Sequence, residues 1–353
     1  MQRNSPNVYV GIDTHAETHF VAVIDEHGRR LTDQEFPATA GGYRKIIEFI
    51  RANGNALSIG VECTGSYGAE ITRQLVGAKF EVIEVNQPSR DQRRRRGKTD
   101  QLDAYSAAEA VMSGRASSAP KGRNGLVEAL RSLRTVRESA LRDRTATINQ
   151  IKAMLVSSPE NVRSPYRSLT TPRLVAALAA TRPQRQPVTS EECTRYALRL
   201  LAKRYQELDE QVRDLTAQID RLLKAHAPGL MNVFGSGPDT GSQLLITAGD
   251  NTARLRSEKQ FAALTGSCPR PASSGKTERN RLNRGGDRKA NSALHHIVLV
   301  RMRYDQRTKD YVARRTAEGL GKKEIMRCLK RYIARQVFPV LVQTLRLNEQ
   351  GMT

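Results

Sequence analysis

Four acidic residues in the first third of the chain have the types and spacing of a metal site. Asp13 and Glu62 each end a short apolar run that is typical of a β-strand. Asp100 and Asp103 lie three residues apart at the start of a predicted helix, so they share one helix face. Taken singly, each acid has a simpler interpretation as a surface residue or a helix cap, and Asp100, which follows Thr99, could simply complement a helix dipole. The joint pattern favours a site in which the four carboxylates converge.

Four converging carboxylates would repel one another, and some would take up protons unless cations neutralised them. Mg²⁺ prefers an all-oxygen environment of this kind. Two such ions about 4 Å apart can activate an attacking oxygen and stabilise a leaving oxygen at a phosphodiester. The expected chemistry is metal-dependent cleavage of phosphodiesters, with two Mg²⁺ ions per site held by Asp13, Glu62, Asp100 and Asp103.

A second group of reactive residues lies in a basic segment between Pro269 and Lys289. Ser274 precedes a glycine there, and its hydroxyl could attack a phosphorus atom if nearby cations offset the developing charge. The cations that could do so are Lys276, Arg279, Arg281, Arg284 and Arg288. Ser-Ser-Gly is also ordinary loop composition, and no histidine or acid is adjacent to act as a base. From the residues alone, a nucleophile and a plain loop both remain open.

The charge of the whole chain favours a polyanionic partner. The 353 residues carry a formal net charge of +22, and nucleic acid is the first candidate. A loop between Arg90 and Lys98 concentrates this charge, and it could contact phosphates or simply be a solvated loop. Its candidate nucleic-acid-binding residues are Arg93, Arg94, Arg95, Arg96 and Lys98.

Composition also excludes several classes of protein. No run of about 18 apolar residues and no signal peptide is apparent, so we expect a cytoplasmic protein without a membrane partner. The four cysteines are widely separated and predict neither a zinc site nor a disulfide framework. Tryptophan is absent and aromatics make up 5%, which argues against recognition by stacking bases and favours phosphate contacts.

The elements that must position the acids follow the order β-β-β-α-β-α-β, with a further helix over residues 99–112. This order is that of an α/β domain of the RNase H-like class. The predicted strands cover residues 8–13, 19–25, 29–36, 57–62 and 80–85, and the two intervening helices begin at residues 41 and 69.

The rest of the chain is predicted to be mainly helical. A helix over residues 124–156 is followed by a Pro- and Ser-containing interruption over residues 157–187, and then by a long helix that ends at His226. In that last helix apolar residues form a heptad seam, which predicts a coiled-coil arm; self-association and packing on the preceding helix both remain open. The seam consists of Leu201, Tyr205, Leu208, Val212, Leu215, Ile219 and Leu222.

The glycine turn at residues 235–241 opens an apolar helix and could bind a DNA phosphate, as helix-hairpin-helix elements do. We therefore expect three domains. They are a catalytic domain over residues 1–118, a helical arm over residues 119–228, and a helical C-terminal domain over residues 229–353 that carries the serine.

Several motifs occur together in the order found in one family. Gly11-Ile-Asp13, Val61-Glu62-Cys-Thr-Gly65 and Gly97-Lys-Thr-Asp-Gln-Leu-Asp-Ala104 resemble the RuvC-like domain of DEDD transposases of the insertion sequence 110 family. The later glycine turn, Phe261-Ala-Ala-Leu-Thr-Gly266, Ser274-Gly275 and Arg284-Gly-Gly286 look like that family's C-terminal transposase domain. The resemblance covers nearly the whole chain. It departs from the family at His15 and Ala16, where many members have a basic residue, and at Asn291, where Arg is frequent.

The resemblance implies a transposase that cuts and rejoins donor and target DNA. It implies that the four acids use Mg²⁺ and that a serine, matching Ser274 with Ser273 as its less favoured neighbour, becomes covalently joined to a DNA end. It also implies a guide, or bridge, non-coding RNA that selects the DNA sites, and a homodimer that assembles into a homotetramer through the arm. Such a protein would be associated with the bacterial nucleoid. Two alternatives remain, which are a RuvC-like junction nuclease that uses water as the nucleophile and an inactive nucleic-acid-binding protein.

Overall fold

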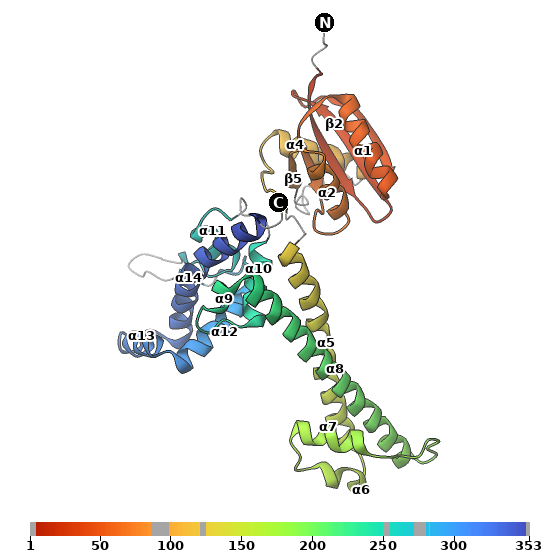
Figure 1. The fold of residues 1–353 in the computed structure, drawn as a ribbon, viewed down its shortest axis with the longest axis vertical. Helices are drawn as coiled ribbons and strands as arrows, with labels where there is room; N and C mark the ends of the chain where they lie inside the picture. The colour runs from red at the N-terminus through yellow and green to blue at the C-terminus, as the bar shows by residue number, and fades with distance from the viewer. Residues whose placement is uncertain are drawn as a thin grey trace. The chain divides into compact units, whose positions relative to one another are not determined.

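The computed structural model describes residues 5–85, 99–120, 125–249, 255–271, 280–281 and 283–350. It divides the chain into two compact units, which are coloured along the chain in Figure 1. Unit 1 comprises Met1–Arg123 and Gly249–Ser257, and unit 2 comprises Asn124–Ala248 and Glu258–Thr353. The three-domain division at residues 118 and 228 stays a prediction.

Unit 1 is built on a mixed five-stranded sheet with the strand order β3-β2-β1-β4-β5. The first three strands form an antiparallel meander, whereas β4 pairs parallel with both β1 and β5. This mixed sheet is the arrangement expected of an RNase H-like domain. The elements are β1 (Asn7–Thr14), β2 (Thr18–Asp25), β3 (Arg30–Pro37), α1 (Ala40–Asn53), β4 (Asn55–Glu62), α2 (Ala69–Gly77), β5 (Val82–Val85) and α4 (Asp100–Met112).

The two faces of the sheet are covered differently because side chains alternate along each strand. On β1, Val10 and Ile12 are fully buried in the larger hydrophobic core, which also contains Ile46 and Ile50 of α1 and side chains of α2. The opposite face is covered by α4, as Figure 1 shows. Asp13 follows Ile12 and therefore belongs to the α4 face.

Helix α4 packs unusually close to the sheet because two strand residues beneath it are glycines. A Cβ atom at Gly11 would lie 1.9 Å from the carbonyl oxygen of Ala104. A Cβ atom at Gly60 would lie 2.6 Å from Val111 Cγ2 and 2.8 Å from the carbonyl oxygen of Ala107. Glycine on the strands and alanine on the helix thus fix where α4 crosses β1 and β4.

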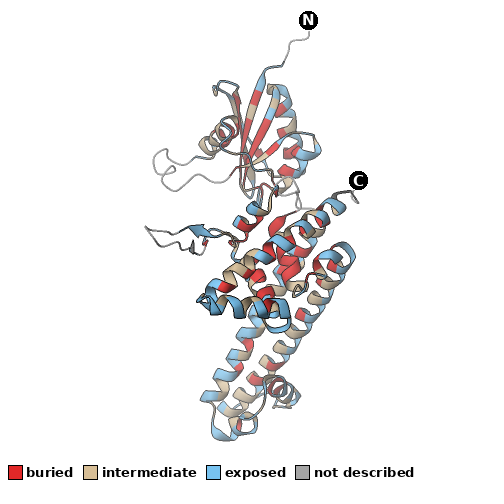
Figure 2. Cartoon of the chain, turned by 90° about the vertical axis from the view of Figure 1, so that its left-hand side faces the viewer, coloured by how far each residue is buried: buried red, intermediate tan, exposed pale blue. Residues whose placement is uncertain are grey.

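Unit 2 is mainly helical, with one two-stranded hairpin among the described residues. In Figure 2 the buried segments of its helices are coloured red. The elements are α5 (Gly125–Ser157), α6 (Glu160–Arg163), η1 (Ser164–Tyr166), α7 (Thr171–Ala180), α8 (Ser190–His226), α9 (Pro228–Met231), α10 (Pro238–Ala248), α11 (Glu258–Leu264), β6 (Arg270–Pro271), β7 (Asn280–Arg281), α12 (Arg288–Tyr304), α13 (Gln306–Ala317) and α14 (Lys322–Gln350).

Helices α5 and α8 lie side by side along most of their length (Figure 1). Helix α8 packs on α5 in the same chain, which is one of the two arrangements that the sequence left open. Val212 and Ile219 of the seam are buried, and its other five residues are only half-buried. A coiled coil between chains stays a prediction.

The stretch over residues 157–187 separates the two long helices, as the sequence predicts, and it contains short helices of its own. Helix α7 begins with Pro172 in its first turn and buries Leu174, Val175 and Leu178 against α8. A proline is tolerated there because the first turn of a helix has free N–H groups in any case. The apolar residues of this short helix thus close a second core at the end of the α5–α8 pair.

All four cysteines are free thiols, as the sequence predicted. None of the helices in the described part of the chain is long and apolar enough to cross a membrane.

Candidate functional site

Asp13 and Glu62 lie at the ends of neighbouring parallel strands. In the register of β1 with β4, Ile12 is the partner of Val61, so Asp13 and Glu62 occupy the next position on each strand. Both residues are buried, with exposed fractions of 6% and 2%. The Thr14 hydroxyl donates a hydrogen bond to the Glu62 carbonyl oxygen at 3.1 Å, which ties the two strand ends together.

Helix α4 starts beside the end of β1 and runs back across the sheet. Its first residue is Asp100, and the Thr99 side chain caps it by accepting a hydrogen bond from the Leu102 N–H at 3.2 Å. One turn later, Ala104 rests on Gly11. Asp100 lies one helical turn before Ala104, and Asp13 lies two strand residues after Gly11. Both separations are about 5–7 Å, so Asp100 is placed over Asp13.

The same register places Asp103 on the row of α4 that faces β4. Ala107, four residues after Asp103, rests on Gly60, and Gly60 lies two residues before Glu62. We infer that Asp103 faces the end of β4, as Asp100 faces the end of β1. One row of α4 therefore presents Asp100 to the end of β1, and the other row presents Asp103 to the end of β4.

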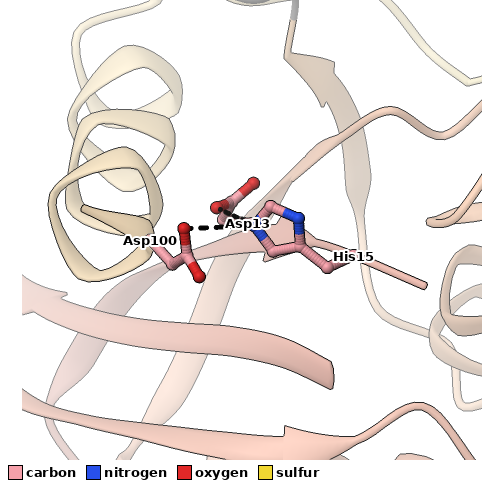
Figure 3. A group of neighbouring side chains, drawn as sticks. All are labelled: Asp13, His15 and Asp100. Carbon is pink, nitrogen blue, oxygen red and sulfur yellow. Dashed lines mark hydrogen bonds and ion pairs between the residues drawn. The ribbon is translucent and has the colours of Figure 1, made fainter. Parts of the chain in front are cut away.

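His15 joins two of the acids, a role that the sequence analysis missed. Its Nε2 atom lies 3.1 Å from Asp13 Oδ2 and 3.2 Å from Asp100 Oδ1, as Figure 3 shows. The ligand atoms of these three residues all lie within 4.8 Å of one another. Glu62 and Asp103 are outside this compact group. The sequence contained a signal for this contact, because side chains two positions apart in an extended chain point to the same side. His15 is therefore expected on the same side as Asp13.

The electrostatics of the group explain why it fits a divalent cation. Burial raises the pKa of Asp13, and the charges of Asp103 and Asp100 raise it further, whereas His15 lowers it. An ionised Asp13 therefore needs a positive partner. The two carboxylates and one imidazole of this group are donors that divalent cations accept, oxygen being the preferred donor for Mg²⁺ and imidazole suiting transition metals.

Two short strands, one on each side of the residues that carry the serine, form a hairpin. β6 and β7 pair antiparallel, with Arg270 opposite Arg281 and Pro271 opposite Asn280. Arg281, Arg284 and Arg288 are exposed, and phosphate binding by them stays a prediction. The remaining predicted residues lie outside the described part of the chain; they are Ser273, Ser274, Lys276, Arg279, Arg93, Arg94, Arg95, Arg96 and Lys98.

Two distant motifs meet at the base of this hairpin. A Cβ atom at Gly286 would lie 2.2 Å from the backbone nitrogen of Gly266, so the Gly-Gly turn packs directly on the end of α11. Asn283 donates to Cys268 Sγ at 3.0 Å, and the Asp287 N–H donates to the Leu264 carbonyl oxygen at 2.7 Å. The glycines therefore hold the two ends of the serine-bearing segment against the helical body.

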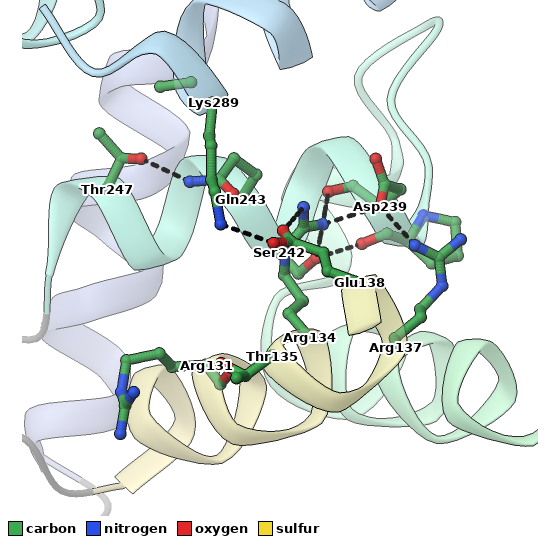
Figure 4. A network of polar contacts seen from close by, with 12 residues as sticks. Arg131, Arg134, Thr135, Arg137, Glu138, Asp239, Ser242, Gln243, Thr247 and Lys289 are labelled. Carbon is green, nitrogen blue, oxygen red and sulfur yellow. Dashed lines mark hydrogen bonds and ion pairs between the residues drawn. The ribbon is translucent and has the colours of Figure 1, made fainter. Parts of the chain in front are cut away.

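A buried arginine connects the C-terminal helices of unit 2 to α5 (Figure 4). Arg134 donates to Asp239 Oδ1 at 2.9 Å, to Ser242 Oγ at 3.1 Å and to Glu138 Oε1 at 3.0 Å. Lys289 at the start of α12 reaches Glu138 Oε2 at 2.6 Å. These contacts occupy the first turn of α10, which follows the glycine turn. Phosphate binding by that turn stays a prediction.

Comparisons with known proteins agree along most of the chain. Residues 10–158 match a family described as "Transposase", of the DEDD type found in IS110, and residues 227–313 match the "Transposase IS116/IS110/IS902 family".

Three curated proteins from bacteria are similar to the chain. A 42 kDa protein of insertion element IS900 from Mycobacterium paratuberculosis is 23% identical over 88% of this chain and 90% of its own length. A 43.6 kDa protein of insertion element IS110 from Streptomyces coelicolor is 34% identical over 41% of this chain and 36% of its own. A probable family 20 transposase from Pseudomonas aeruginosa is 30% identical over 48% of this chain and 49% of its own.

Proposed function

The chain belongs to the IS110 family of DNA transposases, and we propose that it cuts donor and target DNA and rejoins the ends through a covalent bond to Ser274. The observation that carries the proposal is the meeting of Asp13, His15 and Asp100 where two parallel strands end beneath α4. The DEDD family of the first match implies a divalent metal.

We assign the metal site to Asp13, Glu62, Asp100 and Asp103, with two Mg²⁺ ions as the preferred occupants. A bound pair of ions would neutralise charge on the scissile phosphate and on the leaving oxygen. The chain's own residues orient the acids, because Gly11 and Gly60 fix α4 over the strand ends. His15 holds Asp13 and Asp100 together from the side.

Ser274 provides the nucleophile in this proposal. Its Oγ atom bonds to phosphorus as the bond from phosphorus to the leaving deoxyribose oxygen breaks, and Oγ loses a proton while the leaving oxygen gains one. A hydroxyl of another DNA end then attacks the phosphoserine, which restores the serine and joins the two DNA ends. The number of phosphodiester bonds is conserved, so no high-energy cofactor is required.

Sequence choice and assembly complete the proposal. A bridge RNA pairs with donor and target DNA, and cations of both units bind the nucleic-acid backbone. Those cations are Arg93, Arg94, Arg95, Arg96, Lys98, Lys276, Arg279, Arg281, Arg284 and Arg288. Homodimers pair into a tetramer through the half-buried side of α8, and the acids of one chain then act with the serine of another.

The experiment compares Ser274→Ala with its neighbour Ser273→Ala. Each protein is incubated with Mg²⁺, bridge RNA and labelled donor and target DNA, and the products are separated on a denaturing gel. We expect Ser274→Ala to form no protein–DNA adduct and no recombinant DNA, whereas Ser273→Ala forms both. Recombination by Ser274→Ala would disprove the assignment of the nucleophile.

A nuclease that uses water is the second candidate, because the acid site is assembled within unit 1 from strand ends and α4 alone. That enzyme would cut DNA without any adduct in the wild-type protein. The same gel separates the two candidates.

A further inference from the structure

A basic pocket of about 500 Å³ lies in unit 2 beside the serine-bearing hairpin. Its lining includes Pro269 and Arg281, which flank the segment that carries Ser274, and continues onto α14. We propose that this pocket binds backbone phosphates of the DNA strand on which the serine acts. The inference rests on the proposed function and adds a phosphate-binding surface on α14 to it.

The first argument is charge. Six cations line the pocket against one acid, Glu324. Adding Glu258, which pairs with Arg331 and Arg335, and Glu318, which pairs with Arg315, still leaves three positive charges in excess among the described residues. The six cations are Arg281, Arg315, Arg327, Lys330, Arg331 and Arg335.

The second argument is the arrangement of these cations along α14. Arg327, Arg331 and Arg335 are spaced four residues apart, so they form one row on the helix with about 5–6 Å between neighbours. Like charges at this spacing repel one another. Glu324 and Glu258 offset part of this repulsion, and a polyanion that lies along the row would offset more of it.

The third argument is that the row borders a cavity and that its middle residue is partly withdrawn from solvent. The Arg331 side chain is only 17% exposed, whereas that of Arg327 is 37% exposed and that of Arg335 is 58% exposed. Lys330 is held in place by donating to Asn291 Oδ1 at 2.7 Å, and burial lowers the pKa of its ammonium. Cations that are partly removed from water bind an anion more strongly than cations on an open surface. Such a pocket suits phosphodiesters, which keep their charge at every working pH.

The test measures DNA binding by the full-length protein without catalysis. Fluorescence anisotropy with a labelled mixed-sequence DNA duplex is recorded in EDTA at several salt concentrations, for the wild type and for the double variant Arg327→Gln/Arg335→Gln. Each lost phosphate contact lowers the slope of log K against log salt by about 0.9, so we expect the slope to fall by about 2 and binding at 0.1 M salt to weaken at least tenfold.

The matched control is Lys323→Gln/Arg346→Gln, which removes two exposed charges from the same helix outside the pocket lining. We expect this control to change the slope by less than half as much. If the double variant unfolds, Arg335→Gln alone replaces it, because the Arg335 side chain is 58% exposed and its Nε atom lies 3.9 Å from Glu258 Oε2. This single variant is expected to lower the slope by about 1.

Unchanged DNA binding by the pocket variants, or an equal effect of the control, would overturn the proposal. The proposal would also be overturned if the pocket variants bound an RNA of the same sequence more weakly but bound DNA as the wild type does. The proposed function fails separately, because recombination by Ser274→Ala would refute the nucleophile and leave the binding result intact.

Discussion

The acid site of unit 1 and the serine hairpin of unit 2 are built on opposite principles. In unit 1, buried carboxylates are placed by strand ends, and two glycines bring α4 within backbone contact. In unit 2, the described residues on either side of the serine-bearing segment pair as two short strands, and Arg281, Arg284 and Arg288 nearby are exposed. The first site concentrates negative charge, and the second concentrates positive charge.

The largest effect is expected from replacing an acidic side chain with its amide, which removes the charge and keeps the shape of the side chain. Asp13→Asn should lower DNA cutting by roughly 10²–10³-fold or more, the scale of losing a preorganised electrostatic group, because a carboxylate is lost from the metal site. DNA binding measured in EDTA should stay near that of the wild type. Glu26→Gln, an exposed acid of unit 1, is the control and should cut normally. Normal cutting by Asp13→Asn would mean that the acids are only structural.

Unit 1 should be sensitive to a single added methyl group. In Gly11→Ala the new Cβ meets the Ala104 carbonyl oxygen, so α4 must shift away from β1 and carry Asp100 with it. We expect the free energy of unfolding in urea to fall by about 3 kcal/mol and cutting to be lost. Gly77→Ala is the control, because nothing lies within 4 Å of a Cβ atom there. It should be neutral, or more stable by about 0.5 kcal/mol.

Unit 2 should depend on one buried cation that touches no DNA in this account. Arg134→Met leaves Asp239 and Glu138 without their buried partner, and since Asp239 is partly exposed we expect a loss of about 2 kcal/mol in unfolding free energy. Arg131→Met removes an exposed pair with Glu128 on the same helix and should cost at most about 0.5 kcal/mol. Equal losses in urea unfolding would show that the network of Figure 4 is not structural.

Asp13 of unit 1 and Asp209 of unit 2 should contribute to stability with opposite pH dependence. Burial raises the pKa of Asp13 above its ordinary value of 3.8, so the folded state binds more protons and metal-free protein loses stability as the pH rises through that pKa. Asp209 of α8 has a lowered pKa, caused first by its hydrogen bond from Arg213 and then by Arg144, so its contribution is present above 3.8 and is lost as the pH falls.

Urea unfolding in EDTA across acidic pH tests this difference. Asp13→Asn should remove the decrease in stability on raising the pH, and Asp209→Asn should remove the decrease on lowering it. If both variants changed the profile in the same direction, the contrast between the two sites would be wrong.

The features that could be predicted from the sequence are those that depend on local patterns of residues. The alternation along β1 and β4 and the i, i+3 acids of α4 are local features, so the mixed sheet and the helix at Asp100 could be foreseen. Contacts between distant segments could not. The role of His15 depends on where α4 begins, and the basic pocket exists because α14 passes the base of the hairpin. The choice of α5 as the partner of the α8 seam is likewise a tertiary outcome.

The central claim is that the acids and Ser274 act in one reaction, and locating the DNA adduct tests it most directly. Wild-type protein and Asp13→Asn are reacted with Mg²⁺, bridge RNA and DNA, digested with protease and nuclease, and analysed by mass spectrometry for a nucleotide on the peptide that contains Ser274. We expect the adduct on Ser274 in the wild type and none in Asp13→Asn. Cutting without any adduct, or an adduct on another residue, would contradict the account.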